Sequence, residues 1–263
     1  MAILDVRDVG VRFGGVEALR EVSFHVNAGE VTGLIGPNGA GKTTLFNVIS
    51  GLQSPQAGKV FFEGRDVGVF SPDERSRLGI GRTFQAVEVF ADMTVEENVM
   101  IAREVRESSG ALGALLRLPW ARMEARRSEE RVRPIFHHLG LEPYREAPVG
   151  DLPLGIQRRV ELARALAGNP KLLLLDEPAS GMDTGETREL AEDLRWLRRT
   201  FRITVLLVEH DMRFVMGLCD YIYVLNFGRL IAEGRPAEVR ANALVIEAYL
   251  GAEGERQVGA SRA

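Results

Sequence analysis

A glycine-rich stretch of eight residues carries the first chemistry in this chain. It reads G-P-N-G-A-G-K-T and fits the pattern G-x-x-x-x-G-K-[ST] at every fixed position. Glycines let backbone N–H groups approach phosphate oxygens, a lysine adds a compact positive charge, and a threonine hydroxyl can ligate Mg²⁺. The alternative is a glycine-rich turn that binds nothing, which a preceding strand and a following helix argue against. We predict a nucleotide-phosphate site made of Gly36, Pro37, Asn38, Gly39, Ala40, Gly41, Lys42, Thr43 and Thr44.

Two adjacent carboxylates, Asp176 and Glu177, follow the apolar run Leu172–Leu175. A continuous apolar run is typical of a strand buried on both faces, and ligands of such sheets lie beyond the carboxyl ends of the strands. There Asp176 can hold Mg²⁺ through water, and Glu177 can polarise a water for in-line attack on a γ-phosphate. By themselves they would be a solvated pair at a strand end, but the phosphate loop favours the functional interpretation.

Two further polar residues are candidates for the same site. His210 follows the apolar run Ile203–Val208 and is preceded by Glu209, so we expect it at the same edge as Asp176 and within reach of a γ-phosphate. Gln85 lies at the start of a helical region, where its amide could reach the metal or the attacking water. The alternatives without a catalytic role are that His210 is a structural histidine and that Gln85 is an ordinary surface amide.

The helices and strands that must position these residues can be predicted from the hydrophobic pattern and the turn residues. Short strands fill residues 1–35, with turns at Gly14-Gly15 and at 27–29, and the last of them, 30–35, runs into the phosphate loop and a helix over 42–50. Residues 57–70 are predicted as strands with turn signals at Gly58 and Gly64. After Gln157 helices and strands alternate, which favours a parallel sheet covered by helices. The predicted order is helix 157–168, strand 171–176, helix 184–200, strand 203–208, helix 211–217, strand 220–226 and strand 229–234, followed by two short helices.

Residues 94–139 have a helical pattern. Thr94 and Glu97 form a capping-box signature, and Pro134 is expected to kink or restart the helix. The stretch 119–139 is rich in Arg and Glu, which we interpret as a solvated face rather than a binding patch. Its predicted inward side chains are those of Trp120, Met123, Val132, Ile135, Phe136 and Leu139.

Composition narrows the class of protein. With 263 residues, 45% apolar and 27% charged, the chain is long enough for one large or two small globular domains, which excludes wholesale disorder. A net charge of −4 gives no sign of the basic surface that binds nucleic acid. No apolar stretch approaches the ~20 residues of a membrane span. The N-terminus lacks a secretory pattern, so we expect a cytoplasmic protein. The single cysteine, Cys219, is predicted to be a buried structural thiol.

Taken in order and spacing, these motifs resemble the ATP-binding subunits of ABC transporters along essentially the whole chain. The resemblance implies that Phe13 stacks on adenine, that Gln85 is the glutamine-loop residue, that Asp183 contacts the opposite subunit and that His210 is the switch histidine. Several short segments and an insertion around 105–125 resemble the longer of the paired ATPases of branched-chain amino-acid importers. These segments are Arg82–Gln85, Met93–Asn98, Gln157–Arg159, Glu209–Met212, Val215-Met216 and Ala248–Gly251.

The resemblance implies an α/β fold of the P-loop NTPase type, with a RecA-like core around a parallel sheet. An N-terminal antiparallel β-subdomain and an inserted α-helical subdomain complete it. Residues 1–250 then form one ABC ATPase domain, in which 1–85 and 160–250 make the β-subdomain and core and 86–159 the helical subdomain. Residues 251–263 are expected to form a flexible tail.

One motif departs from the family. The signature Leu-Ser-Gly-Gly-Gln aligns with Leu152, Pro153, Leu154, Gly155 and Ile156, followed by Gln157. In the family this loop clamps the γ-phosphate held by the opposite subunit, and Pro153 offers neither a hydroxyl nor an N–H. Each lost charge-assisted hydrogen bond would cost about 1.5–3 kcal/mol. We therefore expect the chain's own site to hydrolyse ATP with a partner's signature, and the site it completes for that partner to be the weaker one.

The resemblance also implies the cofactors and partners. They are ATP with Mg²⁺, a second ATP-binding subunit that is a different chain, two integral membrane permeases and an extracytoplasmic substrate-binding protein. In the family a cytoplasmic helix of each permease docks near the glutamine loop, which here corresponds to residues 86–99, where Phe90, Met93 and Val95 are candidate contacts or core residues. The chain would lie peripherally on the cytoplasmic face of the inner membrane.

Other functions stay open at this stage. Urea and short-chain amide importers and a lipopolysaccharide exporter use close relatives of this ATPase. A soluble ABC ATPase for DNA repair or ribosome work usually has two cassettes, long coiled coils or basic arms, and a P-loop kinase would leave the Glu177, Asp183 and His210 set unexplained. The ATPase does not touch the cargo, so branched-chain amino acids are implied only by the subfamily.

Overall fold

The computed structural model describes residues 1–83, 89–104, 130 and 132–249. Gln85, Trp120, Met123, the insertion around 105–125 and the tail from residue 251 lie outside the described residues, so the predictions on them are untested. No helix in the described part of the chain combines the length and the apolar character that crossing a bilayer requires.

The chain divides into two compact units. One unit consists of Met1–Arg75 with Leu174–Ala263, and the other consists of Ser76–Leu173. Strand β7 (Leu172–Asp176) runs from the second unit into the first. The phosphate loop and the carboxylates Asp176 and Glu177 belong to the first unit, whereas the loop aligned with the family signature belongs to the second.

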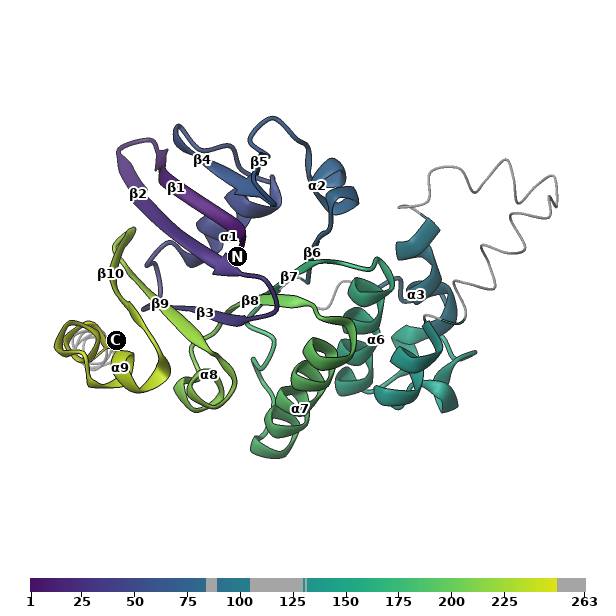
Figure 1. The fold of residues 1–263 in the computed structure, drawn as a ribbon. Coiled ribbons are helices and arrows are strands. Elements are labelled where there is room, and N and C mark those ends of the chain that lie inside the picture. The colour runs from purple at the N-terminus through teal and green to yellow at the C-terminus, as the bar shows by residue number, and fades with distance from the viewer. Residues whose placement is uncertain (84–88, 105–129, 131, 250–263) are drawn as a thin grey trace, which may run out of the picture. The chain divides into compact units, whose positions relative to one another are not determined.

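An antiparallel sheet of four strands opens the first unit, as predicted, in the order β2-β1-β4-β5 (Figure 1). The strands are β1 (Ala2–Phe13), β2 (Val16–Asn27), β4 (Ala57–Phe62) and β5 (Arg65–Asp66). Buried Val22, Phe24 and Val26 alternate with exposed residues on β2, because one face of the sheet packs on the core. Gly58 does not form the predicted turn. It lies inside β4 at φ +79°, where a Cβ would come within 2.3 Å of the Arg7 carbonyl oxygen.

The second sheet positions the site. Its order in the first unit is β10-β9-β3-β8-β7, and in the second unit β6 (Ile80–Arg82) is the neighbour of β7. The remaining strands are β3 (Val31–Ile35), β8 (Thr204–Val208), β9 (Tyr221–Asn226) and β10 (Arg229–Gly234). Strand β3 pairs in parallel with both β8 and β9, and every residue of β3, β7 and β8 is buried. The predicted parallel sheet is therefore confirmed.

Helices of the first unit follow the predicted pattern. They are α1 (Lys42–Ser50), α7 (Thr184–Phe201), α8 (Met212–Leu218), α9 (Pro236–Ala241) and a helix over 243–249. Helix α7 begins at a capping box in which Asp183 accepts hydrogen bonds from the Gly185 and Glu186 amides, and Asp211 caps α8 in the same way. Helices α7 and α8 lie side by side (Figure 1).

The described part of the second unit contains two helices and a helical segment that bear on the site. They are α3 (Val95–Glu104), residues 132–138, which include Pro134, and α6 (Leu154–Ala167). The predicted capping box is present, because Glu97 accepts from the Thr94 amide at 2.8 Å and the Glu97 amide donates to the Thr94 hydroxyl at 3.2 Å. The inward residues predicted for this region are confirmed where they are described, since Val132, Ile135, Phe136 and Leu139 are buried.

Helix α2 (Pro72–Leu78) and strand β6 were not predicted, and α6 begins three residues earlier than predicted. The hydrophobic pattern does not reveal α2 because the side chain that this helix buries is the guanidinium of Arg75 instead of an apolar group. The Arg75 guanidinium donates to the Val48 and Ile49 carbonyls at 2.6 and 2.8 Å and so satisfies the C-terminal end of α1.

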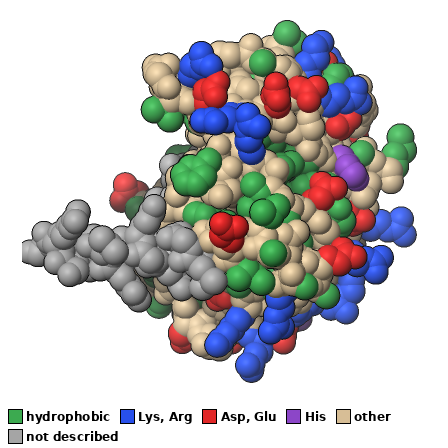
Figure 2. All heavy atoms as spheres, turned by 90° about the vertical axis from the view of Figure 1, so that its left-hand side faces the viewer, with side chains coloured by type: hydrophobic (Ala, Val, Ile, Leu, Met, Phe, Trp, Pro, Cys, Tyr) green, Lys and Arg blue, Asp and Glu red, His purple; other side chains and the backbone are tan. Residues whose placement is uncertain are grey.

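Cys219 agrees with the prediction of a buried structural thiol. Cys219 is buried, and burial raises the pKa of its thiol, which marks a structural and unreactive cysteine. Figure 2 shows the face that carries β2, β10 and α9, where acidic and basic side chains are interspersed with apolar ones.

Candidate active site

The phosphate loop connects β3 to α1 and depends on its glycines. Gly36 has φ +156°, and a Cβ there would lie 2.0 Å from the Leu225 carbonyl oxygen. Gly41 has φ +103°, and a Cβ there would lie 2.5 Å from the Ala18 carbonyl oxygen. No side chain caps α1, which begins directly after Gly41. The loop therefore packs closely on its neighbours while the first-turn amides of α1 stay available for an anion.

Lys42 lies across the loop that precedes it. Its ammonium group donates to the Gly36 carbonyl at 2.8 Å and to the Pro37 carbonyl at 3.0 Å. Burial lowers the Lys42 pKa, and the charges of Glu177 and Asp176 act against this shift. The cation is thus held where incoming phosphates would replace the two carbonyl oxygens as its partners.

Asp176 and Glu177 stand at the end of β7, as predicted. Asp176 is only 4% exposed, and the Glu177 amide donates to the Val208 carbonyl at 2.9 Å. Glu177 has φ +49°, a left-handed conformation that is uncommon for a residue with a Cβ. Such strain tends to occur at functional sites, where it fixes the direction of a side chain.

The structure brings His210 and Glu177 together. His210 Nδ1 lies 3.8 Å from Glu177 Oε2 and 3.7 Å from Glu209 Oε2, and the His210 side chain is about half exposed. The prediction that His210 and the carboxylates share one edge of the sheet is confirmed. An exposed imidazole is chemically able to donate a hydrogen bond to an oxygen of a ligand.

Glu209 is a site residue that the sequence reasoning missed. Its side chain is fully buried, and its Oε1 accepts from the Ala179 amide at 2.7 Å. Oε2 accepts from the His210 amide at 2.9 Å and lies 3.4 Å from the Asp211 amide. This carboxylate therefore ties the loop after β7 to the loop after β8. Its signal in the sequence is a carboxylate directly after a continuous apolar strand.

Two other predicted residues lie at element ends in the first unit. Phe13 ends β1 and is 51% exposed, so its ring is open to a flat ligand. Asp183 is exposed, and its carboxylate accepts from the Gly185 amide at 2.6 Å and the Glu186 amide at 2.9 Å. In this chain its observed role is to cap α7.

The loop aligned with the family signature begins α6 in the second unit. Pro153 is the N-cap residue of α6 and makes no side-chain cap hydrogen bond. The Ile156 and Gln157 amides donate to the Pro153 carbonyl, and the Gln157 side chain donates to the Leu152 carbonyl at 2.8 Å. Leu154 is 57% exposed. The dipole of a helix N-terminus is therefore retained, but no side-chain hydroxyl accompanies it.

The donor set fits Mg²⁺ bound together with a nucleotide. Thr43 is exposed in the first turn of α1, and Asp176 ends β7, so one hydroxyl and one carboxylate are the described protein donors. No group of three or more His, Cys, Asp or Glu that could hold a metal occurs among the described residues. Mg²⁺ suits such a sparse oxygen set, because it commonly takes one or two protein ligands with substrate phosphates and water.

Comparisons with known proteins agree with this geometry. The ABC transporter family matches residues 19–180, and the C-terminal segment family described as branched-chain amino acid ATP-binding cassette transporter matches residues 229–255. The high-affinity branched-chain amino acid transport ATP-binding protein LivG of Salmonella typhimurium is 40% identical over 95% of this chain and 98% of its own. The lipopolysaccharide export system ATP-binding protein LptB of Escherichia coli is 33% identical, with the same coverage.

A solved structure shows the same fold. The ADP conformation of MJ1267, an ATP-binding cassette of an ABC transporter, has a TM-score of 0.82 at 35% identity and covers 95% of this chain and 99% of its own. Fold and site together define a nucleotide-binding P-loop ATPase of the cassette type. The chain belongs to the ATP-binding proteins of ABC transporters.

Proposed function

We propose that this chain hydrolyses ATP to power the import of branched-chain amino acids through a membrane transporter. One observation carries the catalytic part, namely the meeting of the strained Glu177 with His210 beside an intact phosphate loop. The cargo rests on the 40% identity to LivG along nearly the whole of both chains. The matched C-terminal segment at 229–255 supports the same cargo.

Each candidate residue of the site has a role in the proposed reaction. Amides of the loop and of the first turn of α1 hold the phosphates, and Lys42 exchanges its two loop carbonyls for phosphate oxygens. Glu177 orients the attacking water and accepts its proton, while His210 contacts the γ-phosphate. Thr43, Asp176 and Gln85 would hold Mg²⁺, which neutralises charge on the outer phosphates when bound.

The adenine and the opposite subunit complete the proposed site. Phe13, with its exposed ring, stacks on adenine. A second ATP-binding chain supplies a signature loop to this site, and this chain's Leu152–Gln157 loop faces the partner's nucleotide. Because Pro153 contributes neither hydroxyl nor N–H, we propose that the two sites are unequal and that the partner is a different chain. Asp183 lies at the same proposed interface.

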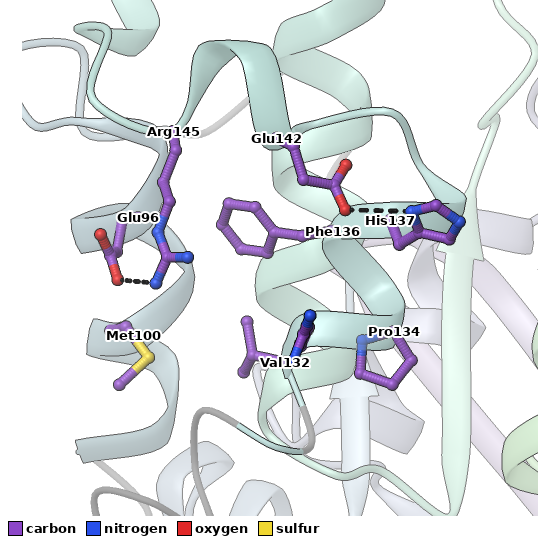
Figure 3. A pocket seen from close by; sticks show the side chains of 9 residues that line it. Glu96, Met100, Val132, Pro134, Phe136, His137, Glu142 and Arg145 are labelled. Atoms are coloured by element: carbon purple, nitrogen blue, oxygen red, sulfur yellow. Dashed lines mark hydrogen bonds and ion pairs between the residues drawn. The ribbon is translucent and has the colours of Figure 1, made fainter.

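A pocket in the second unit is the proposed docking place for a permease helix. It has a volume of about 870 Å³, and its walls come from α3 and from residues 132–145 (Figure 3). Met100, Val132 and Phe136 line its apolar part, and the Arg145–Glu96 ion pair closes one side. We propose that residues 86–159, which lie within the second unit, act as the helical subdomain and pass its movement to the permeases.

The groove residues named from the sequence differ in exposure. Phe90 is 47% exposed and lies 5.7 Å from the Arg164 guanidinium, so it can contact a partner. Val95 is fully buried and is therefore a core residue. In this proposal the chain lies on the cytoplasmic face of the membrane and works with two permeases and an extracytoplasmic binding protein.

Lipopolysaccharide export is the second candidate, because LptB is 33% identical over the same share of the chain. The complete transporter in lipid vesicles would distinguish the cargoes. We expect binding protein loaded with leucine, isoleucine or valine to stimulate ATP hydrolysis several-fold, and the same protein exposed to urea or short amides to leave the rate at its basal value. Stimulation by lipopolysaccharide alone would overturn the import proposal.

A further inference from the structure

A second pocket lies between α7 and α8, outside the ATP site. It has a volume of about 280 Å³, and only elements of the first unit line it. Pockets for drug-sized ligands usually measure about 300–1,000 Å³, so this one suits a small molecule or ion. Neither the phosphate loop, nor Asp176, nor His210 lines it.

Three guanidinium groups gather at this pocket. Arg188 and Arg195 are seven positions apart on α7, which is about two helical turns and places them on one face. Arg213 comes from the first turn of α8. Arg195 donates to the Gly217 carbonyl at 2.7 Å, which fixes its position between the two helices. Among the residues that the structure describes, neither the Arg188 nor the Arg213 side chain makes an ion pair.

Within the lining of the pocket, positive charge exceeds negative charge. The acidic residue in the lining is Asp211, whose carboxylate already accepts from the Arg213 amide at 2.7 Å and the Phe214 amide at 3.2 Å. Three guanidinium groups and one carboxylate give a formal charge of +2. Ala191 and Phe214, both buried, form part of the apolar lining of the pocket.

We infer that this pocket binds a small, multiply charged anion that carries phosphate or carboxylate groups. Arginine forks match both groups in bidentate geometry, and charge complementarity calls for at least a dianion. The walls come from helices that begin directly after the loops of Asp183 and His210. A bound anion therefore joins α7 to α8 and restrains both loops.

Calorimetric titration of the 263-residue chain tests this inference. The probes are inorganic pyrophosphate and, in a separate arm, citrate, each added without metal while ADP saturates the phosphate loop. We expect saturable binding of at least one probe at one site per chain. Arg188→Gln and Arg213→Gln should each weaken it about tenfold, the effect of one charge-assisted hydrogen bond. Both arginines are exposed, so either substitution should leave the fold intact.

A matched control removes an equal charge elsewhere. Arg240 on α9 is exposed and outside the pocket, so Arg240→Gln should bind the probe as the parent chain does. The probe should also slow hydrogen exchange over 182–191 and 211–217. Binding by pyrophosphate alone would assign a phosphate ligand, and binding by citrate alone a carboxylate ligand.

Three results would overturn the inference. The first is the absence of saturable binding by either probe, and the second is an equal loss of binding in Arg240→Gln. The third is that Arg188→Gln and Arg213→Gln bind the anion as the parent chain does but associate more weakly with other transporter subunits. That third result would make the pocket a protein interface instead.

Discussion

At the scale of single residues, charged groups organise the catalytic edge of the sheet. Lys42 is bound by carbonyls of its own loop, and Glu209 is buried among amides of two different loops. A buried charge is costly unless hydrogen bonds compensate it, so the Glu209 carboxylate holds these loops in a defined arrangement. The His210 amide is one of the donors to Glu209, and Glu177 lies two residues before another donor, the Ala179 amide.

Glu209→Gln tests this positioning role. A glutamine amide nitrogen cannot accept a hydrogen bond, so either Ala179 or the pair His210 and Asp211 loses its acceptor. We expect the free energy of unfolding to fall by about 1.5–3 kcal/mol. The rate of ATP hydrolysis should fall about tenfold while the KM for ATP stays near its parent value, because the phosphate loop is untouched.

Urea unfolding, steady-state kinetics and hydrogen exchange at Ala179 and His210 measure these effects. Glu192→Gln on the exposed surface of α7 is the matched control and should change none of them. If Glu209→Gln is as stable and as active as the parent chain, the hydrogen bonds of Glu209 do not position the site.

Residue types at fixed spacing predicted much of the candidate site. The phosphate loop, both carboxylates and His210 could be named because their chemistry requires those types after a strand. The left-handed φ of Glu177 and the burial of Glu209 could not, because they depend on which strands become neighbours in the sheet. Asp183 was named for a contact with another subunit, whereas its visible bonds cap a helix.

At the scale of elements, caps decide where several helices begin. Asp183, Asp211 and the pair Thr94 and Glu97 each satisfy N-terminal amides of a helix. Long periodic helices and fully apolar strands were predicted within a few residues. Helix α2 was missed because a buried guanidinium takes the place of its apolar face. The turn predicted at Gly58 was wrong because this glycine lies inside a strand, where it allows β1 to approach more closely than a Cβ would permit.

Asp183→Ala should destabilise α7. It removes two cap hydrogen bonds, so we expect the free energy of unfolding to fall by about 1 kcal/mol. Asp183→Ser retains a capping oxygen and should restore most of that loss. Urea unfolding of the three chains measures both effects. Equal stability of Asp183→Ala and the parent chain would show that the cap contributes nothing.

The C-terminal helix over 243–249 gives a prediction for alkaline pH. Burial raises the pKa of Tyr249 to about 12, compared with about 10 for a tyrosine in an unfolded chain. As the pH rises from 10 to 12, the unfolded chain loses this proton first, so folding stability falls over that window. Tyr249→Phe should make the loss between pH 10 and pH 12 shallower in urea unfolding.

Tyr144→Phe in the second unit serves as the control for this measurement. The alkaline loss will not vanish in Tyr249→Phe, because burial also raises the pKa of Tyr223. If the slopes of the parent chain and Tyr249→Phe coincide, Tyr249 does not contribute to alkaline destabilisation.

At the scale of the whole molecule, the two units carry complementary halves of the proposed machinery. The first unit contains the phosphate loop, Glu177 and His210, and the second contains the divergent signature loop and the proposed docking pocket. Because Pro153 brings no hydroxyl to the signature loop, we propose that the chain works with a different ATP-binding subunit.

Light scattering of Glu177→Gln with ATP and Mg²⁺ tests the need for a different subunit. Blocked hydrolysis should preserve any closed dimer, and two Pro153-containing signatures would make both sites of a homodimer weak. We expect the chain to stay monomeric at micromolar concentration. A tight homodimer under these conditions would contradict the unequal-site proposal.

The central claim is that hydrolysis at Glu177 drives the uptake of branched-chain amino acids. Uptake of labelled leucine in cells that lack this chain, complemented with the parent gene, Glu177→Gln or Glu192→Gln, tests it most directly. We predict that the parent gene and Glu192→Gln restore uptake, and that Glu177→Gln does not, because loss of a general base slows hydrolysis about 10²–10⁴-fold. Leucine uptake that is unchanged by loss of the gene, or restored by Glu177→Gln, would contradict the claim.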